Sequence, residues 1–373
     1  MKLSKFSSAE ERRRFLERKL RKRFKNVGKS LIEKENIHCE NLIGGTFLPL
    51  GVAGPLKIVK IKDNSSCEVF IPLATTEGAL VASVNRGCKA VSLSGGVRVL
   101  VEKVGTTRGP VFYVENIAKA REFELWLEKN FERIKGAAEA TSSHLRLLRY
   151  EFFLFSPFVF LRFYFDTDRA MGMNMATIAT SAIVKLVEKE LGIKCISISG
   201  NFCVDKKASF LNFLLGRGFR AWAEVEINSK ICKKVLKIEP EKIVKVWLAK
   251  NMAGSAFSGT LGFNAHFANI VTAFFSATGQ DLAHTVEGSL GTTFAEVRGK
   301  NLYFSVHLPA VMVGVVGGGT KLKVKKEAIE ITGAKTSEDL AEVLAGAVLA
   351  GELSLLASLA EGTLAEAHRK LGR

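Results

Sequence analysis

Apolar residues recur with two different periods along this 373-residue chain, and these periods predict its helices and strands. Residues 170–191 predict a helix, because the second half of this run places valine and leucine on one side and lysine and glutamate on the other. The aromatic-rich residues 152–165 alternate instead, which predicts one strand with both faces partly covered. Residues 193–199 predict a further buried strand.

The other elements follow from turn residues, helix caps and β-branched residues. Further strands are expected at 97–104, at 111–114 and within 283–315, and residues 41–55 are expected to be loops and short strands. Further helices are expected at 8–24, at 117–149, over much of 238–280, within 71–90 after a short opening strand, and as an apolar helical pair at 339–370.

Strand, helix, strand, helix and strand follow one another between residues 111 and 199, which is the pattern of a compact α+β unit inserted in a larger one. No stretch reaches the roughly 18 charge-free apolar residues that a membrane span needs. The closest stretch, residues 341–360, contains Glu342 and Glu352 and is predicted to be a buried helix of a large soluble protein.

The composition fits a globular protein of two or three packed units, since 47% of the residues are hydrophobic and 24% are charged. This excludes wholesale disorder. The net charge of +17 favours an anionic ligand or partner. Six scattered cysteines without a CxxC pair support neither a disulfide framework nor a metal site, and they favour a reduced, cytoplasmic compartment.

The positive charge is concentrated at the N-terminus, where residues 1–25 hold eleven lysine and arginine residues against three glutamates. Ser8 and Glu11 form a capping-box pattern at the start of the expected helix. The simplest interpretation is a solvated basic helix that docks on the body of the protein or on a second subunit. Contact with nucleic acid or an anionic membrane is the minor alternative.

Two common nucleotide signatures are incomplete. Gly28–Lys29–Ser30 resembles the end of a phosphate-binding loop, but Arg23 occupies the place of its leading glycine, and no GxGxxG run occurs. Residues 314–320 contain three successive glycines that let a backbone approach a ligand, and residues 170–175 open a helix whose free N–H groups favour anions. The structural alternatives are a flexible hairpin for the first segment and core packing for the second.

Four polar positions are candidates for chemistry. Glu77 lies in a small-residue turn, where it is either a capping residue or a desolvated proton donor. Lys206 follows Asp205 on a loop after a buried strand and could steady an oxyanion, although such a charged run is more often solvated surface. Asp281 ends an apolar helix at an otherwise buried depth. His368 lies among basic residues near the C-terminus, where solvent exposure is the default.

Taken together, these segments resemble the catalytic portion of class I 3-hydroxy-3-methylglutaryl-coenzyme A (HMG-CoA) reductases, over about residues 30–370 and in the family's order. The runs that carry the resemblance are ENLIG (40–44), GVAGPL (51–56), ATTEG (74–78), VASVNRGC (81–88), TTRGPV (106–111), AMGMNM (170–175), SGNFCVDKK (199–207), GFNAHFANIVTA (262–273), GQD (279–281), VGVVGGGT (313–320) and AGELSLLASLA (350–360).

The resemblance implies an α+β fold, in which a large helix-centred α/β domain carries an inserted ferredoxin-like dinucleotide-binding domain and a small N-terminal helical segment. The implied boundaries are residues 1–45 for the basic N-terminal segment, 46–108 and 199–373 for the substrate-binding catalytic domain, and 109–198 for the NADP-binding domain. Family members are homodimers or larger homo-oligomers with the active site at a subunit interface. The short chain, without a regulatory tail or a membrane anchor, resembles the soluble archaeal type, with a cytoplasmic location implied.

The implied activity is the two-step reduction of HMG-CoA to mevalonate and coenzyme A with two NADPH, for isoprenoid precursor synthesis. By resemblance, Lys206 stabilises the oxyanion and His368 protonates the departing thiolate. Glu77, kept protonated by its environment, supplies a proton, and a buried Asp281 couples Glu77 to Lys206.

The resemblance also assigns binding residues. Those implied to hold the hydroxymethylglutaryl group are Glu40, Arg108, Ser199, Asp205, Lys207, Lys250 and Asn269. Those implied to contact NADPH are Ser142, Arg169, Met171, Gly172, Met173, Asn174, Gly317 and Gly318. No metal is implied.

Two positions depart from the family. Arg169 stands where an aspartate near the nicotinamide is usual, and the nearest carboxylate is that of Asp168. Ser143 stands where an arginine near the adenosine 2′-phosphate is common in animal members, so the preference for NADPH over NADH is supported less strongly. These departures leave an alternative function, a catalytically impaired relative that acts as a binding or scaffold protein.

Overall fold

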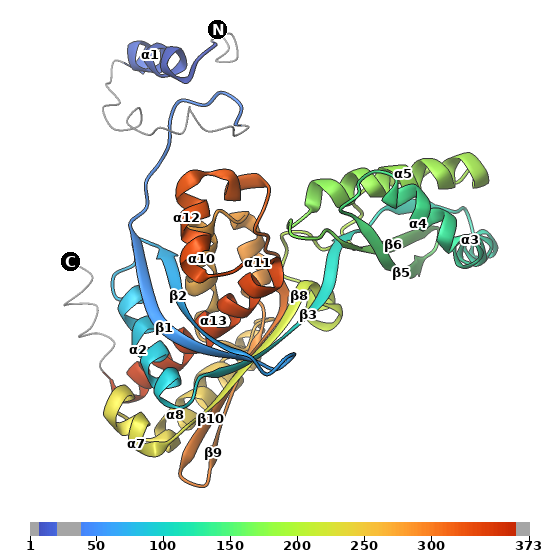
Figure 1. The fold of residues 1–373 in the computed structure, drawn as a ribbon. Helices are drawn as coiled ribbons and strands as arrows, with labels where there is room; N and C mark the ends of the chain where they lie inside the picture. The colour runs from blue at the N-terminus through green and yellow to red at the C-terminus, as the bar shows by residue number, and fades with distance from the viewer. Residues whose placement is uncertain (1–6, 21–38, 363–373) are drawn as a thin grey trace.

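The computed structural model describes residues 7–20 and 39–362, which form a mixed helix-and-sheet fold with two separate hydrophobic cores (Figure 1). The N-terminal helix α1 (Ala9–Leu20) begins as predicted. Glu11 N donates to Ser8 Oγ at 3.1 Å, and Glu11 Oε2 accepts from Ser8 N at 3.3 Å, so both halves of the capping box are present. The predicted continuation of this helix to residue 24 lies outside the described residues.

The larger unit is built on a sheet with the strand order β2–β1–β3–β8–β10–β9, antiparallel throughout except for the pair β1 and β3. Its strands are β1 (Leu50–Lys60), β2 (Ser66–Ala74), β3 (Val97–Arg108), β8 (Arg217–Ile227), β9 (Thr292–Arg298) and β10 (Asn301–Val311). The loops and short strands predicted for residues 41–55 are confirmed up to Pro49, but the strand is longer than expected, because β1 begins at Leu50 and absorbs its Gly–Pro step through a register shift between Ala53 and Leu56.

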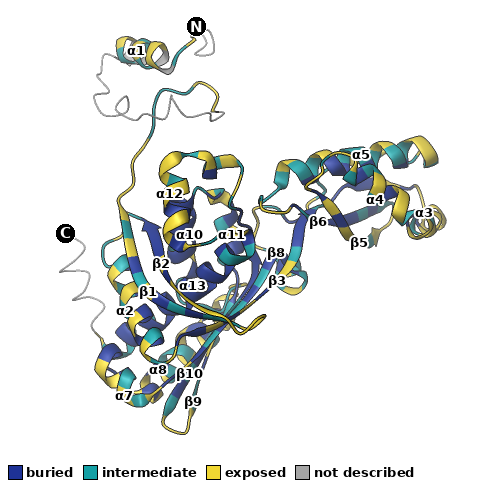
Figure 2. Ribbon diagram, in the orientation of Figure 1, coloured by how far each residue is buried: buried dark blue, intermediate teal, exposed yellow. Residues whose placement is uncertain are grey.

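The core of this unit surrounds one long helix, α13 (Ser337–Glu361), which runs through the middle of the larger unit and is buried over most of its length (Figure 2). Helix α2 (Leu80–Leu93) packs against it so closely that a Cβ on Gly87 would lie 1.9 Å from the carbonyl oxygen of Ala350. Of the described helices, α13 alone has the length and apolarity for a membrane span, but 83% of its most apolar window is buried inside the protein. The predicted buried helix at 341–360 is therefore confirmed.

The predicted helical pair at 339–370 is wrong within the described residues, because a single helix runs from Ser337 to Glu361 through Gly346 and Gly351 and ends at Gly362 in a left-handed conformation. Residues 363–370 lie outside the described part of the chain. The remaining helices of this unit are α6 (Phe210–Leu215), α7 (Ser229–Ile231), η4 (Cys232–Leu236), α8 (Pro240–Val246), η5 (Trp247–Gly254), α9 (Ser255–Ser258), α10 (Phe267–Thr278), η6 (Leu282–His284), α11 (Thr285–Gly288), η7 (Gly318–Lys321) and α12 (Lys323–Thr332).

The smaller unit grows from the end of β3. Residues Thr106–Arg108 of β3 leave the larger sheet and pair with β6 in a second sheet, together with β4, β5 and β7. Apolar side chains of this sheet and of its three helices form the second core. The elements are β4 (Val111–Tyr113), α3 (Ile117–Lys129), α4 (Phe131–Glu139), β5 (Arg146–Phe155), β6 (Phe158–Asp166), α5 (Met173–Leu191) and β7 (Cys195–Ser197).

Three predictions fail inside this unit. The single strand at 152–165 is a hairpin of β5 and β6, since the chain turns at Ser156–Pro157 and proline cannot continue a central ladder. The helix at 117–149 breaks at Asn130, and its last residues already belong to β5. The strand at 193–199 shortens to the partly exposed β7, because it lies at the edge of the sheet with β4 on one side.

In the larger unit, the predicted strands at 283–315 begin with η6 and α11 instead, because the side chain of Asp281 accepts a hydrogen bond from Ala283 N and caps a helical turn. The helical prediction for 238–280 holds except at residues 259–266, which form a loop before α10.

Candidate active site

A cavity of about 580 Å³ lies between the start of α5 and the larger unit. Its wall gathers residues 170–175, 205–206, 279–281 and 314–320, four segments that are far apart in the sequence. The predicted site residues in this wall are Arg108, Met171, Gly172, Met173, Asn174, Asp205, Lys206, Asp281, Gly317 and Gly318. The fold therefore brings the candidate catalytic lysine, the aspartate and both glycine-containing segments to one place.

Lys206 and Asp281 form an ion pair in this cavity, with 2.7 Å between Nζ and Oδ2. The pKa of Asp281 is lowered: partial burial, the largest influence, acts to raise it, but hydrogen bonds from Lys206 and from Ala283 N outweigh that effect. The prediction that Asp281 is buried is wrong for this chain, since 36% of its side chain is exposed. The reason is its place as the N-cap of η6 at the cavity wall.

The loop that carries Lys206 has an unusual backbone. Asn201, Val204 and Lys206 all have positive φ, at 63°, 47° and 57°. Each such residue costs roughly 1–3 kcal/mol, and the β-branched valine is the least suited to it. The buried amide of Asn212 holds this loop by donating to Val204 O at 2.9 Å. The surrounding structure thus fixes Lys206 in a conformation that the chain does not favour by itself.

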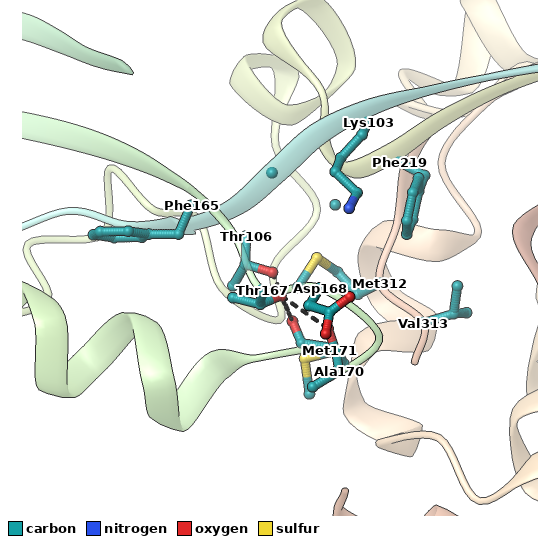
Figure 3. Close-up of a pocket in the computed structure, with 12 residues that line it drawn as sticks. Lys103, Thr106, Phe165, Thr167, Asp168, Ala170, Met171, Phe219, Met312 and Val313 are labelled. Atoms are coloured by element: carbon teal, nitrogen blue, oxygen red, sulfur yellow. Dashed lines mark hydrogen bonds between the residues drawn. The ribbon is translucent and has the colours of Figure 1, made fainter. Parts of the chain in front are cut away.

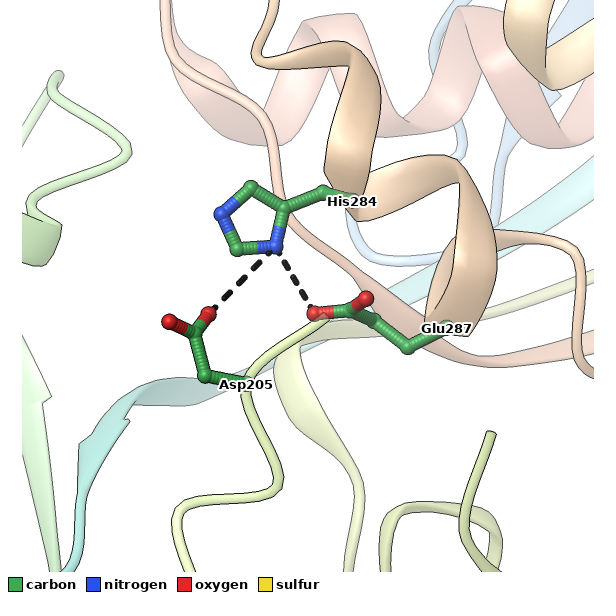
Figure 4. A group of neighbouring side chains, drawn as sticks. All are labelled: Asp205, His284 and Glu287. Carbon is green, nitrogen blue, oxygen red and sulfur yellow. Dashed lines mark hydrogen bonds and ion pairs between the residues drawn. The ribbon is translucent and has the colours of Figure 1, made fainter. Parts of the chain in front are cut away.

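Below the ion pair lies a fully buried polar cluster of Arg217 from β8, His284 from η6 and Glu287 from α11. The Arg217 guanidinium pairs with Glu287 and donates to Asp205 Oδ1 at 2.9 Å. His284 Nδ1 lies 2.7 Å from Glu287 Oε1, and Figure 4 shows the imidazole between the two carboxylates. Glu287 Oε1 also accepts from Lys206 N at 3.3 Å, so the cluster is tied directly to the loop that carries Lys206.

Asp205, His284 and Glu287 each offer one ligand atom, and these atoms lie within 4.8 Å of one another, a spacing that could hold a metal ion. However, Arg217 already binds the same oxygens of Asp205 and Glu287. A guanidinium supplies the positive charge and the directed donors that two carboxylates need. The cluster is therefore an ion-pair network built around Arg217.

Two threonine hydroxyls fix the segment that leads into α5: Thr106 lies at the end of β3, and Thr167 lies in the turn after β6. Thr106 Oγ1 donates to Met171 O at 2.6 Å, and Thr167 Oγ1 donates to Ala170 O at 2.8 Å (Figure 3). Gly172 precedes the helix with φ 86°, and no side chain caps this end. The first N–H groups of α5 are consequently available to an anion in the cavity.

The glycine-rich segment that follows β10 forms the opposite wall. Gln280 anchors its start, because its side-chain amide exchanges hydrogen bonds with Gly314 N and O at 2.9 and 3.0 Å. Gly317 and Gly318 have φ of 85° and 53°, and a Cβ on either would meet nothing within 4 Å. The segment therefore presents bare backbone to the cavity, as predicted for a ligand-cradling loop.

Glu77 and Asn269 lie together, away from this wall. Asn269 Nδ2, on α10, donates to Glu77 Oε2 at 2.8 Å. Glu77 is exposed, in a turn held by Thr75 Oγ1, which accepts from Glu77 N at 2.9 Å. The prediction of a desolvated Glu77 is thus wrong for a single chain, because the turn between β2 and α2 carries it to the surface. Among the described residues, Glu77 forms no hydrogen bond or ion pair with Lys206 or Asp281.

The other predicted binding residues lie as follows. Arg108 Nε donates to Thr177 Oγ1 on α5 at 3.0 Å, and Ser199 Oγ lies 3.4 Å from Cys203 Sγ. Lys207, Lys250, Glu40 and Arg169 are exposed, and Ser142 is half-buried. His368 lies outside the described residues.

Comparison with known proteins places this site in a family. The sequence profile described as hydroxymethylglutaryl-coenzyme A reductase matches residues 8–373. The chain belongs to the HMG-CoA reductase family. The 3-hydroxy-3-methylglutaryl-coenzyme A reductase of Methanocaldococcus jannaschii is 46% identical over 98% of this chain and 93% of its own length. The enzyme of the same name from Methanothermobacter thermautotrophicus is 44% identical over 97% of this chain and 92% of its own.

The same family appears among solved structures. The class II 3-hydroxy-3-methylglutaryl-CoA reductase of Streptococcus pneumoniae, bound to NADPH in open conformations, superposes with a TM-score of 0.71 and covers 96% of this chain and 98% of its own. At 18% sequence identity, this likeness supports the reductase fold alone. The family assignment, which the sequence motifs indicated, is thereby confirmed, and the chain is an oxidoreductase of the HMG-CoA reductase family.

The motif comparison with reductases did not find Arg217, His284 or Glu287. Arg217 opens a strand, and the two others sit three residues apart just after the GQD run. The available signal was two ionisable residues, His284 and Glu287, in a short apolar stretch between Leu282 and Leu290. Such a spacing places both side chains on one side of a helical turn.

Proposed function

We propose that this chain is a class I HMG-CoA reductase of the short archaeal type, which reduces HMG-CoA to mevalonate and coenzyme A with two molecules of NADPH. The observation that carries the proposal is the cavity in which the Lys206–Asp281 pair meets Arg108, the uncapped start of α5 and the glycine-rich segment. These groups supply a cation for an oxyanion, a cation for a carboxylate and a backbone surface for phosphate groups.

The residues present fit a dinucleotide. The free N–H groups of Met173 and Asn174 at the start of α5 suit a pyrophosphate, and the open backbone at Gly317 and Gly318 allows close approach. In the pneumococcal enzyme of the same fold, NADPH is the bound dinucleotide. When bound, NADPH supplies hydride to the substrate carbonyl. We assign its binding to residues 109–198, as a ferredoxin-like insertion that includes Ser142 and Arg169.

In the first step, hydride adds to the thioester carbon and the carbonyl oxygen becomes an alkoxide. The Lys206 ammonium, held by Asp281, donates a hydrogen bond to this oxygen. When the carbonyl re-forms, the carbon–sulfur bond breaks, and His368 gives a proton to the coenzyme A thiolate. In the second step, hydride adds to the aldehyde carbon, and Glu77 gives its proton to the oxygen to form the alcohol of mevalonate.

In this proposal, a second set of residues binds the substrate. Arg108 faces the cavity and, with Lys207 and Lys250, would pair with the free carboxylate of the hydroxymethylglutaryl group. Asn269, Asp205, Ser199 and Glu40 would complete the contacts with its hydroxyl and carbonyl groups. The strong positive net charge of the chain suits the polyanionic coenzyme A and NADPH.

The proposed mechanism requires a second chain. Glu77 and Asn269 lie outside the cavity wall that holds Lys206, so we propose a homodimer in which Glu77 of one chain completes the cavity of the other. Apolar exposure beside Lys250 supports a partner surface, since Phe257 is 98% exposed and Leu248 is 56% exposed. We also propose that the basic N-terminal segment docks on the body of the protein or on a second subunit; contact with nucleic acid or an anionic membrane is the lesser alternative. The proposed location is cytoplasmic.

The test is turnover by the purified protein. We expect oxidation of NADPH that depends on HMG-CoA, with two NADPH consumed for each mevalonate formed. Under the alternative function, a binding or scaffold protein, HMG-CoA binds without any turnover with NADPH or NADH. That result would overturn the proposal.

A further inference from the structure

The imidazole of His284 faces a different carboxylate with each of its ring nitrogens. Nδ1 lies 2.7 Å from Oε1 of the buried Glu287. Nε2 lies 3.8 Å from Oδ2 of Asp281, and it is buried without a hydrogen-bond partner. This Oδ2 is the same oxygen that pairs with Lys206 Nζ. His284 thus connects a buried carboxylate to the ion pair in the cavity.

The geometry constrains where protons lie on His284. Glu287 Oε1 already accepts from Arg217 and from Lys206 N, so this oxygen is also the acceptor toward His284, and His284 Nδ1 must carry the hydrogen between them. His284 Nδ1 lies 2.7 Å from Glu287 Oε1 but 3.3 Å from Arg217 Nη1, so Glu287 is its nearer partner. In a neutral imidazole, Nε2 would then turn a lone pair toward the Asp281 carboxylate. A proton on Nε2 replaces that repulsion by attraction.

The charges around His284 also favour a proton on Nε2. The charged groups that face it from the neighbouring elements are Asp205, Lys206, Arg217, Asp281 and Glu287. Three carboxylates against one lysine and one arginine leave an excess negative charge in a largely buried place. An imidazolium at His284 neutralises this excess, as a buried network requires.

We propose that His284 and Glu287 are positioning residues for the Lys206–Asp281 pair: Glu287 holds the imidazole through Nδ1, and the protonated Nε2 holds Asp281 in place beneath Lys206. This inference rests on the proposed role of Lys206 in the reduction. Loss of the Nε2 proton at higher pH would push Asp281 away and misplace the lysine ammonium. The turnover number should therefore fall on the alkaline side, while substrate affinity changes little.

Kinetics of three variants test this across pH. In H284Q, the amide can donate toward Asp281 but does not titrate, so we expect kcat near the wild-type value at low pH without the alkaline fall. In E287Q, we expect kcat to drop about tenfold with KM for HMG-CoA within about twofold, because the imidazole loses its anchor. An H284Q profile that keeps the wild-type inflection, or an E287Q enzyme with wild-type kcat, would overturn the proposal.

His307 provides the matched control. It is a half-buried histidine whose Nε2 is also buried without a hydrogen-bond partner, but it lies on β10 and stacks on Trp222. Burial, together with nearby Arg220, lowers the pKa of His307 to about 4. H307Q should therefore keep the wild-type pH profile. A change of profile in H307Q equal to that in H284Q would mean that loss of any buried histidine has this effect, against a specific role for His284.

A second measurement does not depend on turnover. Nitrogen-15 NMR of the histidine side chains in the full-length protein reports the protonation midpoint of His284, with H284Q used to assign its signals. Replacing Asp281 by asparagine should lower this midpoint, because the carboxylate that stabilises the imidazolium is gone. An unchanged midpoint refutes the proposed contact between His284 and Asp281. A shifted midpoint in a protein without reductase turnover refutes the proposed function but supports this contact.

Discussion

The carboxylate of Glu352 lies at the N-terminus of α10 and holds His266 twice. Glu352 Oε1 accepts from His266 N at 2.6 Å and lies 3.1 Å from His266 Nδ1. Ala265 N and Thr293 Oγ1 donate to the other carboxylate oxygen at 3.0 and 2.7 Å. The central helix α13 thereby fixes the start of α10, the helix that presents Asn269 to Glu77.

This arrangement predicts pH-dependent stabilisation by Glu352. The pKa of Glu352 is lowered: burial, the largest influence, acts to raise it, but His266 and the other donors outweigh burial. A carboxylate with a lower pKa in the folded state stabilises above its unfolded pKa of about 4.3, and this stabilisation is lost as pH falls through the folded value. E352Q should lower the free energy of unfolding by about 2–4 kcal/mol at pH 7, and by less in acid.

Urea denaturation at neutral and acidic pH measures this difference. Glu122→Gln is the control, because Glu122 pairs with Lys119 on the exposed side of α3 and should contribute nothing measurable. If E352Q lowers the free energy of unfolding by the same amount at both pH values, the stabilisation does not depend on the charge of Glu352.

The proposed shared active site predicts complementation between two inactive variants. E77Q and K206A should each lose turnover alone, because one lacks a proton donor and the other lacks a cation. In a mixed dimer, one cavity carries both substitutions and the other carries none. Co-expression should therefore restore roughly a quarter of wild-type activity when dimers form at random. Mixed dimers as inactive as either parent would show that Glu77 and Lys206 serve the same cavity from one chain.

The role assigned to His368 predicts a difference between substrates. H368Q should slow the reduction of HMG-CoA more than the reduction of free mevaldehyde, because only the thioester releases a thiolate that needs a proton. Steady-state rates with both substrates measure this ratio. Equal slowing would remove His368 from the protonation of the thiolate.

The departure at Ser143 predicts a weak dinucleotide preference. Ser143 is exposed, next to Ser142, so an arginine there could pair with the 2′-phosphate that distinguishes NADPH from NADH. S143R should raise the ratio of kcat/KM for NADPH to that for NADH about tenfold. The matched variant S143Q, which adds a polar side chain without charge, should leave the ratio near the wild-type value. A ratio that S143R leaves unchanged would place the 2′-phosphate elsewhere.

Local signals were sufficient for much of the fold. The capping box at Ser8, the amphipathic run of α5 and the apolar run of α13 act within a few turns of one helix, so the sequence alone predicted them. The hairpin of β5 and β6 was hidden because both strands are aromatic and meet across only two residues, Ser156 and Pro157.

Only part of the candidate site could be predicted from the sequence. The motifs predicted the segments that line the cavity, because each motif is contiguous in the sequence. The partnership of His284 and Glu287 with Arg217 could not be predicted, since about 70 residues separate them and only folding brings β8 beneath η6. The exposure of Glu77 could not be predicted from the local sequence. The solvation of this carboxylate depends on how the fold places β2 and α2 and on what covers them.

We propose that HMG-CoA is reduced in the cavity around Lys206 and Asp281. The most direct measurement compares mevalonate formation by the wild-type protein, K206A and K300A, where Lys300 is an exposed lysine in the turn between β9 and β10. K206A should remain folded and bind HMG-CoA but lose about 10²–10³ in kcat, while K300A should keep the wild-type rate. Mevalonate formed by K206A at the wild-type rate would show that the reduction does not depend on this cavity.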